Sequence, residues 1–462
     1  MRYRLQRISG VCLAVAVLPF LWAESLARDS ETVLHAFEYD SDGGFPFAGP
    51  TMDSKGNLYG VADFGGAFDG VCCGTVYELM PTQKGGWKYS VIYTFKGNIL
   101  GEAPVGGLIL DEAGNLYGTA QIGGRVLGCG IVYELSPNAK GEWKKTDLHA
   151  FTHPDAPHYD GCTPSSYLVF DQTGNLYGTT QLGGGNEYDG QECGETNWGC
   201  GTVFKLAPQE NGKWKETLIH RFPERSGDGQ EPYAGLVFDH SGNLWGTTID
   251  GTDYSTFGTA FELTPDANGK WKESAVFDFT GNSTGYGPYA GLVADAENNI
   301  YGATYYGGNG AGLIFKLTPG KGGRITENVI HAFETCNETE CPDGIGPFGG
   351  LTMDSNGHLY GTATQGGAQG TFCNPPGEDI EVGCGVVFEL APAGNNNWNY
   401  SILYAFPGGT QGSYLLDDRL SVAAGGNIFG TAFVGGDVGQ NSVCPEEVIL
   451  EPGCGVVFQL TP

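Results

Sequence analysis

The chain has 462 residues, including 78 glycines and 13 cysteines, and a formal net charge of −30 at pH 7. This length exceeds what a single small core needs, and the strong negative charge argues against nucleic acid or anionic lipid as partners, because the protein would repel them. A cation, a neutral glycan or a basic partner is compatible with the charge, and so is a role in solubility alone.

Residues 1–27 are typical of a signal peptide. Three arginines precede an apolar run, Val11–Trp22, and small residues follow it. The run is shorter than the ~20 residues that a membrane-spanning helix needs, and no later stretch is long enough to span a membrane. We therefore expect an exported protein, periplasmic or extracellular, with one repeat domain over residues 28–462.

A short phrase, Gly-Asn-Leu-Tyr-Gly or a close variant, then recurs seven times along the chain. The copies begin at Gly56, Gly114, Gly174, Gly242, Asn298, Gly357 and Gly426. Neighbouring copies are 56 to 69 residues apart. A period of this size is typical of proteins built from structural repeats.

Three further phrases accompany each copy. Pro-x-x-Gly-Leu-x-x-Asp precedes it, and Gly-Thr-Val-Tyr-Glu-Leu and Trp-Lys-x-x-x-Leu-His-x-Phe follow it, all with variations. Each phrase is short, rich in β-branched and aromatic residues, and bounded by turn formers, which are strand signals. We predict an all-β fold, a seven-bladed β-propeller of four-stranded antiparallel blades, with strands A to D in the order of the phrases.

The two ends of the domain distinguish a ring from a β-solenoid. The Trp/Phe phrase first appears alone, as Glu31–Phe37, before any other phrase, and the last repeat ends without it. A solenoid leaves both ends open and needs caps, whereas a ring lets the N-terminal strand complete the last blade. The offset therefore predicts a ring closed by the N-terminal strand.

We interpret the repeated residues as structural. An Asp before Gly-Asn bonds its own backbone in a tight turn; it occurs at Asp53, Asp111, Asp171, Asp239, Asp295 and Asp354. The His of the last phrase is replaced by Tyr93, Phe277 and Tyr404, which predicts a packed ring rather than a metal ligand or catalytic group. The Trp that opens this phrase is expected to pack between blades.

The variable loops predict the functional face. A–B and C–D turns keep their length, whereas the B–C and D–A loops vary and hold all twelve cysteines beyond Cys12. In an exported protein these cysteines indicate disulfides rather than zinc, because no tight Cys-x-x-Cys or Cys/His set is present. The predicted pairs are Cys193–Cys200, Cys336–Cys341, Cys373–Cys384 and Cys444–Cys454. The pairing of Cys72, Cys73, Cys129 and Cys162 stays open.

These loops also carry acids and aromatics, and binding residues are often found on variable loops of a rigid scaffold. The candidate ligand-binding residues are Tyr159, Asp160, Tyr188, Asp189, Trp198, Tyr254, Tyr305, Tyr306, Glu378 and Asp379. Paired carboxylates serve glycosidic acid/base chemistry or Ca²⁺ binding, and Asp40–Gly44 resembles a fragment of a calcium loop. No catalytic residue, metal triad or other cofactor motif is recognisable.

The combined phrases resemble the GloVer tandem-repeat family of exported bacterial proteins over essentially the whole mature chain. The resemblance implies an exported repeat protein, often with a C-terminal anchor. This chain ends on its last predicted strand, so a soluble exported form is expected.

Two functions remain as hypotheses. The first is a non-catalytic binding module that holds a glycan, peptide or protein ligand on the long-loop face, at the top of the central channel. The alternative is an extracellular carbohydrate-active hydrolase or lyase that uses loop carboxylates on the same face. We expect a monomer in either case.

Overall fold

The computed structural model describes most of the repeat domain. The described residues are 30–66, 73–97, 101–124, 128–152, 159–185, 199–223, 228–251, 256–334, 341–367, 373, 383–416, 419–436, 444 and 453–462. The predicted signal peptide lies outside them. Within these ranges, no helix has the length and hydropathy that a membrane crossing requires.

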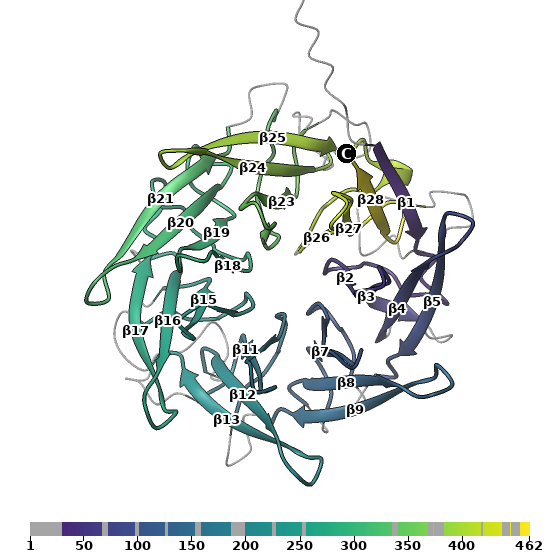
Figure 1. The fold of residues 1–462 in the computed structure, drawn as a ribbon, viewed down its shortest axis with the longest axis horizontal. Helices are drawn as coiled ribbons and strands as arrows, with labels where there is room; N and C mark the ends of the chain where they lie inside the picture. Colours follow the sequence, from purple (N-terminus) through teal and green to yellow (C-terminus); the bar gives the residue numbers. More distant parts are fainter. Residues whose placement is uncertain are drawn as a thin grey trace, which may run out of the picture.

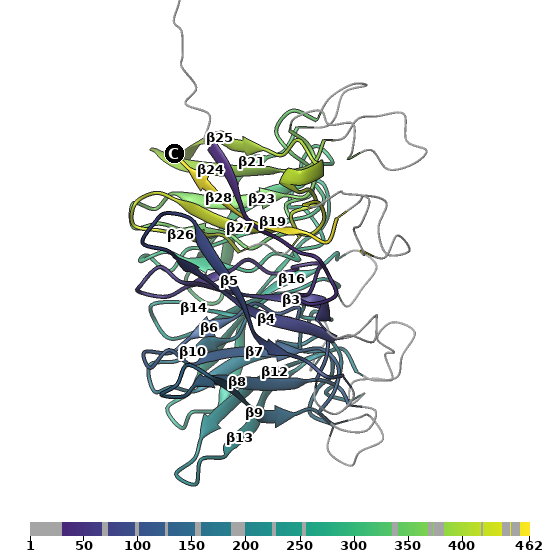
Figure 2. The same ribbon diagram turned by 90° about the vertical axis from the view of Figure 1, so that its right-hand side faces the viewer.

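The described residues form seven four-stranded antiparallel sheets arranged as a ring (Figure 1). This confirms the predicted seven-bladed propeller. We number the blades 1 to 7 by their A strands, in chain order. Figure 2 shows the ring edge-on, with the blades stacked around its circumference.

Each strand class occupies one position in every blade. The A strands are β2 (Thr51–Met52), β6 (Ile109–Leu110), β10 (Val169–Phe170), β14 (Val237–Phe238), β18 (Val293–Ala294), β22 (Thr352–Met353) and β26 (Ser421–Val422). The B strands are β3 (Leu58–Gly66), β7 (Leu116–Ala120), β11 (Leu176–Thr180), β15 (Leu244–Thr248), β19 (Ile300–Thr304), β23 (Leu359–Ala363) and β27 (Ile428–Ala432). The C strands are β4 (Cys73–Pro81), β8 (Ile131–Pro137), β12 (Thr202–Pro208), β16 (Thr259–Pro265), β20 (Leu313–Pro319), β24 (Val386–Gly394) and β28 (Val456–Thr461). The D strands are β5 (Trp87–Thr94), β9 (Trp143–Ala150), β13 (Trp214–Arg221), β17 (Trp271–Asp278), β21 (Ile325–Ala332), β25 (Asn397–Ala405) and, for blade 7, β1 (Ser30–Ala36). A single 3₁₀ turn, η2 (Gly409–Gln411), is described between β25 and β26.

The ring is closed by strands from opposite ends of the chain. β1 pairs antiparallel with β28, from Ser30 opposite Thr461 to Ala36 opposite Val456. The sheet order in blade 7 is β1-β28-β27-β26, and β1 lies beside the C-terminal strand in both views (Figures 1 and 2). The predicted closure by the N-terminal strand is confirmed.

The repeated Asp is a turn residue, as predicted. In blade 2, Asp111 Oδ1 accepts hydrogen bonds from the backbone N–H groups of Ala113 and Asn115, at 2.9 and 2.8 Å. Its Oδ2 accepts from Asn115 Nδ2 and from the hydroxyl of Tyr117. Ala423 replaces the Asp in blade 7, where the backbone bonds of the turn are kept between Ala423 and both Gly426 and Asn427.

The repeated Trp packs between blades, as predicted. Each ring contacts an aromatic side chain of the B strand in the preceding blade; the pairs are Trp87–Phe429, Trp143–Tyr59, Trp214–Tyr117, Trp271–Tyr177 and Trp398–Tyr301. In blade 5 the Trp position holds Ile325, and the facing B strand compensates with a larger residue, the fully buried Trp245. Such aromatic pairs contribute about 0.5–1.5 kcal/mol each beyond their buried area.

The B–C and D–A loops meet on one face of the ring. Isolated bridges join them in successive blades, for example Glu102 with Ile122 and Cys162 with Leu182. A disulfide links Cys129 of a B–C loop to Cys162 of a D–A loop, which resolves one pairing that the sequence left open.

Two predicted disulfides, Cys373–Cys384 and Cys444–Cys454, are confirmed. Cys73, Cys200 and Cys341 are also disulfide-bonded. Cys72, Cys193 and Cys336 lie outside the described residues, so the pairs Cys193–Cys200 and Cys336–Cys341 stay predictions.

Peptide mapping of the unreduced protein tests these two pairs. We expect peptides that hold Cys193 linked to Cys200 and Cys336 linked to Cys341, each closing a short loop that stabilises the fold by about 2–3 kcal/mol. Linkage of Cys200 or Cys341 to any other cysteine would contradict the predicted pattern.

Removal of β1 tests closure. A truncated chain that starts at Tyr39 leaves β28 as an unpaired edge, so we expect a lower melting temperature and aggregation through that edge. A chain that starts at Ser30, and so keeps β1, is the control and should melt like the full mature chain. Equal melting of both truncations would show that closure does not stabilise the ring.

Candidate functional site

The boundaries between blades share one aromatic arrangement on the outer rim. Near the end of each D strand, a ring at the His/Tyr/Phe position packs edge-on against the Phe two residues later, with centroids 4.4 to 5.2 Å apart. The seven pairs are His35–Phe37, Tyr93–Phe95, His149–Phe151, His220–Phe222, Phe277–Phe279, His331–Phe333 and Tyr404–Phe406. The prediction that this position requires a packed ring is confirmed.

Each of the four histidines also has a carboxylate partner, which the sequence analysis missed. Nε2 contacts an Asp of the following D–A loop in the pairs His35–Asp42, His149–Asp160, His220–Asp228 and His331–Asp343, at 2.8, 3.0, 3.2 and 3.2 Å. The missed signal is coupled variation between repeats. Asp-Gly follows the ring only in the four repeats with His; the other three have Leu-Gly, Thr-Gly and Gln-Gly there.

In three of the four pairs, the Asp also fixes the start of its loop. Asp42 accepts a hydrogen bond from the backbone N–H of Glu38, and Asp160 accepts from the N–H and the hydroxyl of Thr152. Asp42 belongs to the stretch that resembles a calcium-loop fragment. Both of its carboxylate oxygens have protein partners, His35 and the backbone of Glu38. These pairs therefore anchor the D–A loops to the D strands.

A third position completes each boundary. It lies four residues before the ring in the next blade, and holds Glu31, Tyr89, Lys145, Glu216, Glu273, Glu327 and Tyr400. Where it is Tyr, the ring stacks on the His of the preceding blade. His35 lies on Tyr89 and His331 on Tyr400, with centroids 3.5 and 4.0 Å apart.

Where the third position is Glu, a carboxyl group is buried between blades. Oε1 of Glu31, Glu216 and Glu327 is buried and has no hydrogen-bond partner among the described residues. Burial raises the pKa of Glu216 and of Glu327 to about 7. Burial also raises the pKa of Glu31, and the hydrogen bond from Gln411 opposes this change.

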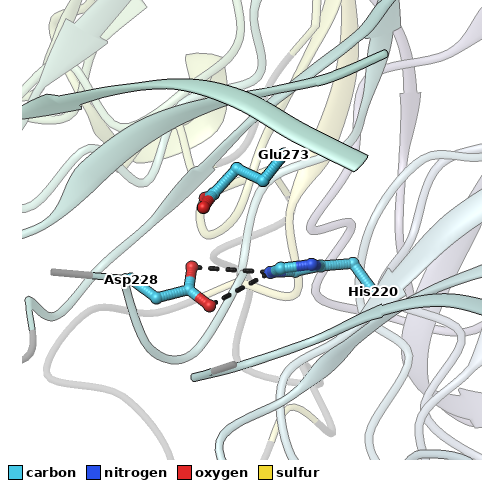
Figure 3. Close-up of side chains that lie close together, drawn as sticks. All are labelled: His220, Asp228 and Glu273. Atoms are coloured by element: carbon cyan, nitrogen blue, oxygen red, sulfur yellow. Dashed lines mark hydrogen bonds and ion pairs between the residues drawn. The ribbon is translucent and has the colours of Figure 1, made fainter. Parts of the chain in front are cut away.

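Three potential metal ligands converge only at the boundary of blades 3 and 4, within the part of the chain that the structure describes. His220 of β13, Asp228 of the D–A loop and Glu273 of β17 place one donor atom each within 4.8 Å of the others (Figure 3). His220 is 4% exposed and Asp228 is fully buried. Both oxygens of Asp228 face Nε2 of His220, at 3.4 and 3.2 Å.

This cluster borders an open groove between β13 and β17. The groove has a volume of about 920 Å³ and is lined by His220, Glu273 and, among others, Arg221 and Trp271. The cluster is therefore reachable from solvent along the outer rim.

A second candidate lies at the mouth of the central channel. On the long-loop face, successive ring contacts join Phe257, Tyr286, Tyr306, Tyr305, Tyr289, Phe348 and Tyr233. We call these seven residues the aromatic ladder. Phe257 and Tyr306 are 45% and 41% exposed, and Tyr306 stacks on Tyr286 with centroids 4.8 Å apart.

Large side chains occupy part of the centre of the ring. Tyr167 stands where most other repeats have Gly, and its hydroxyl donates to the carbonyl of Gly49 across the ring. Arg419 lies over the Tyr167 ring, and both residues line a small cavity of about 20 Å³.

Carboxyl groups lie near the aromatic ladder. Burial raises the pKa of Glu231, and the charge of Asp250 raises it further. Burial also raises the pKa of Asp250. The charges of Asp250 and Glu231 also raise the pKa of Tyr289, which places both acids beside the ladder.

The predicted ligand residues divide into three groups. Tyr305 and Tyr306 belong to the aromatic ladder. Tyr159 is half-buried and packs against the core of blades 2 and 3, and Asp160 pairs with His149. Tyr188, Asp189, Trp198, Tyr254, Glu378 and Asp379 lie outside the described residues.

The fold and its repeated boundaries define a repeat-built β-propeller. The chain belongs to the Gloeobacter/Verrucomicrobia repeat family, whose model matches residues 23–191 and 184–444. No curated protein matches the sequence.

Several solved structures are distantly similar. The periplasmic gluconolactonase PpgL of Pseudomonas aeruginosa is 12% identical over 78% of this chain and 84% of that chain, with a TM-score of 0.45. PorZ, a surface component of the type-IX secretion system of Porphyromonas gingivalis, is 12% identical over 92% of this chain and 48% of that chain, with a TM-score of 0.48. Similarity at this level carries no information about activity.

The buried glutamates predict a pH-dependent stability. A carboxyl group with a raised pKa holds its proton more tightly in the folded state, so its contribution favours folding at low pH and is lost as the pH rises from about 4.5 to 7. Glu216→Gln and Glu327→Gln replace the carboxyl group by an amide that does not ionise, so they remove this loss of stability at high pH. After allowance for solvent screening, we expect each variant to be more stable than wild type by about 1 kcal/mol at pH 8 and equal to it at pH 4.

Chemical denaturation at the two pH values measures this difference. Glu112 is exposed, and Glu112→Gln is the control. Its effect on the free energy of unfolding should be small and the same at both pH values. A constant difference for Glu216→Gln across pH would exclude a buried, titrating carboxyl group.

Proposed function

We propose that this protein is an exported, non-catalytic binding module that holds a neutral glycan on the aromatic ladder. The observation that carries the proposal is the exposure of Phe257 and Tyr306 at one end of the ladder. Flat aromatic rings present apolar area with little loss of side-chain entropy on binding, and tyrosine adds a hydroxyl at the edge. Sugar rings offer matching apolar faces and hydroxyl groups.

The acids beside the ladder complement this chemistry. Glu231 and Asp250 supply carboxyl oxygens that accept hydrogen bonds from sugar hydroxyls. The net charge of −30 disfavours anionic polymers, which leaves neutral glycans as the favoured class.

The compartment proposal rests on the cysteines. Disulfides such as Cys129–Cys162 persist in oxidising compartments. Together with the signal-like residues 1–27, they support export to the periplasm or beyond. The protein acts there as a monomer, with the disulfide-stapled loops presented on one face.

An enzyme that cleaves glycans is the second candidate. The neighbouring acids Glu231 and Asp250 favour it, because glycosidases use a pair of carboxyl groups and the general acid of the pair has a raised pKa. Turnover of a bound polysaccharide that Glu231→Gln abolishes, without a loss of binding, would favour the enzyme over the binding module.

Affinity electrophoresis in gels that contain xylan, β-glucan or galactomannan tests the binding proposal. We expect at least one of these neutral polysaccharides to retard the wild-type protein. Tyr306→Ala and Phe257→Ala should each weaken binding by at least about 1.4 kcal/mol, a tenfold change, because each removes an exposed ring.

Val329→Ala and Ile402→Ala are matched controls. Both residues are exposed hydrophobics on outer strands, β21 and β25, and their replacement should leave retardation unchanged. Equal losses in the ladder variants and these controls would contradict a site at the channel mouth, as would the absence of retardation by any neutral polysaccharide.

A further inference from the structure

We propose that His220, Asp228 and Glu273 form a site for a divalent transition-metal ion such as Zn²⁺ or Mn²⁺. The site is separate from the aromatic ladder, since two of its ligands are on D strands at the outer rim (Figures 1 and 3). It joins two blades: His220 comes from blade 3, and Glu273 from blade 4.

The donor set has the chemistry of such a site. One imidazole nitrogen and two carboxylates are common ligands of Zn²⁺, which in open sites takes three protein ligands and leaves a fourth position for water or another molecule. The groove between β13 and β17 supplies access to that fourth position. Imidazole is a poor ligand for the hard ions Ca²⁺ and Mg²⁺, so we expect selectivity against both.

The distance between His220 and Asp228 is close to that between two ligands of one ion. Ligand atoms at about 2.0–2.1 Å from a tetrahedral ion lie about 3.3 Å from one another. Nε2 of His220 is 3.2 and 3.4 Å from the two oxygens of Asp228, and the donor atoms of all three residues already lie within 4.8 Å. Small side-chain rotations are therefore enough to close the site.

This boundary differs from its three relatives that also pair His with Asp. The side chains of His220 and Asp228 are 3% and 0% exposed, whereas those of the other three pairs are 11% to 18% exposed. Tyr89 and Tyr400 stack on His35 and His331, which leaves no carboxylate in the third position there.

The boundary of blades 2 and 3 is the natural comparison. It contains the same residue types, His149, Asp160 and Glu216, but there Asp160 is bound by Thr152 as well as by His149. Among the described residues, these three do not bring their donor atoms together as the cluster of blades 3 and 4 does.

Electrostatics favours a cation at this point. Two carboxylates close together in a buried setting repel each other, and a positive charge between them offsets both the repulsion and the loss of hydration. Arg221 lines the same groove and provides the competing explanation, in which a basic side chain neutralises the acids. The two explanations differ in whether an ion binds with defined stoichiometry.

Equilibrium dialysis of the full mature protein, without a polyhistidine tag, tests the proposal. The protein is first stripped with a chelator and then dialysed against Zn²⁺ or Mn²⁺ in an excess of Ca²⁺, which occupies the other acidic positions of the surface. We expect one ion per chain, and a rise in melting temperature, because an ion that binds only the folded state stabilises it.

Two substitutions remove ligands and keep the approximate shape of the side chain. Phe occupies the His position in blade 4, as Phe277, so His220→Phe suits the local packing, and Glu273→Gln is nearly isosteric. We expect each to weaken binding at least tenfold and to abolish the rise in melting temperature. His149→Phe and Glu216→Gln, the matched changes at the neighbouring boundary, should leave both unchanged.

Three results would overturn the proposal: no stoichiometric binding by the wild-type protein, equal binding by the two His→Phe variants, or displacement of the ion by Ca²⁺. The first would indicate a structural cluster that basic side chains neutralise, and the third a site that takes hard cations as readily as transition-metal ions. The second would place the ion elsewhere on the chain. None of them affects the proposed glycan site, which is tested by the ladder variants alone.

Discussion

The pairing of β1 with β28 is the constraint on which the rest of the structure depends. A blade covers its two faces only by packing against its neighbours, so a ring with one open boundary exposes two faces and an unpaired strand edge. The hydrogen-bond ladder from Ser30 to Ala36 closes that boundary with residues more than 400 positions apart in the chain. Every other boundary can then use short-range contacts between consecutive repeats.

These boundaries combine a constant framework with variable chemistry. The Trp of a D strand packs on the Tyr or Phe of the preceding B strand, and the edge-on ring pairs at the rim keep one geometry in all seven blades. Within this frame, the third position of a boundary holds a stacked tyrosine in some blades and a buried glutamate in others. The ring of the D strand has an Asp partner where it is His, whereas Tyr404 has Gln411. A fold that repeats its backbone can therefore hold a different side-chain cluster at each boundary, and the cluster of His220, Asp228 and Glu273 is one outcome.

The channel shows the same principle at the centre of the ring. Tyr167 fills the space that glycines such as Gly107 leave, since a Cβ on Gly107 would lie 1.8 Å from the Tyr167 ring. On the long-loop face, the aromatic ladder extends from blade 4 to blade 6. Loops outside the four-stranded sheets supply these rings, so this face can vary while the blades keep their structure.

The sequence by itself determined the features that depend on local or periodic signals. Strand number, ring closure, the Asp turns, the inter-blade tryptophans and the short-range disulfides Cys373–Cys384 and Cys444–Cys454 all followed from repeat spacing and turn chemistry. Only the tertiary structure decided which side chains meet across blades: the disulfide of Cys129 with Cys162, the His–Asp pairs, the buried glutamates and the aromatic ladder. Coupled variation of His with Asp-Gly was visible in the repeats, but its meaning was not, because the contact joins a strand to a loop of variable length. The physical reason is general: periodicity specifies the backbone, whereas a site depends on side-chain positions that the closed ring alone brings together.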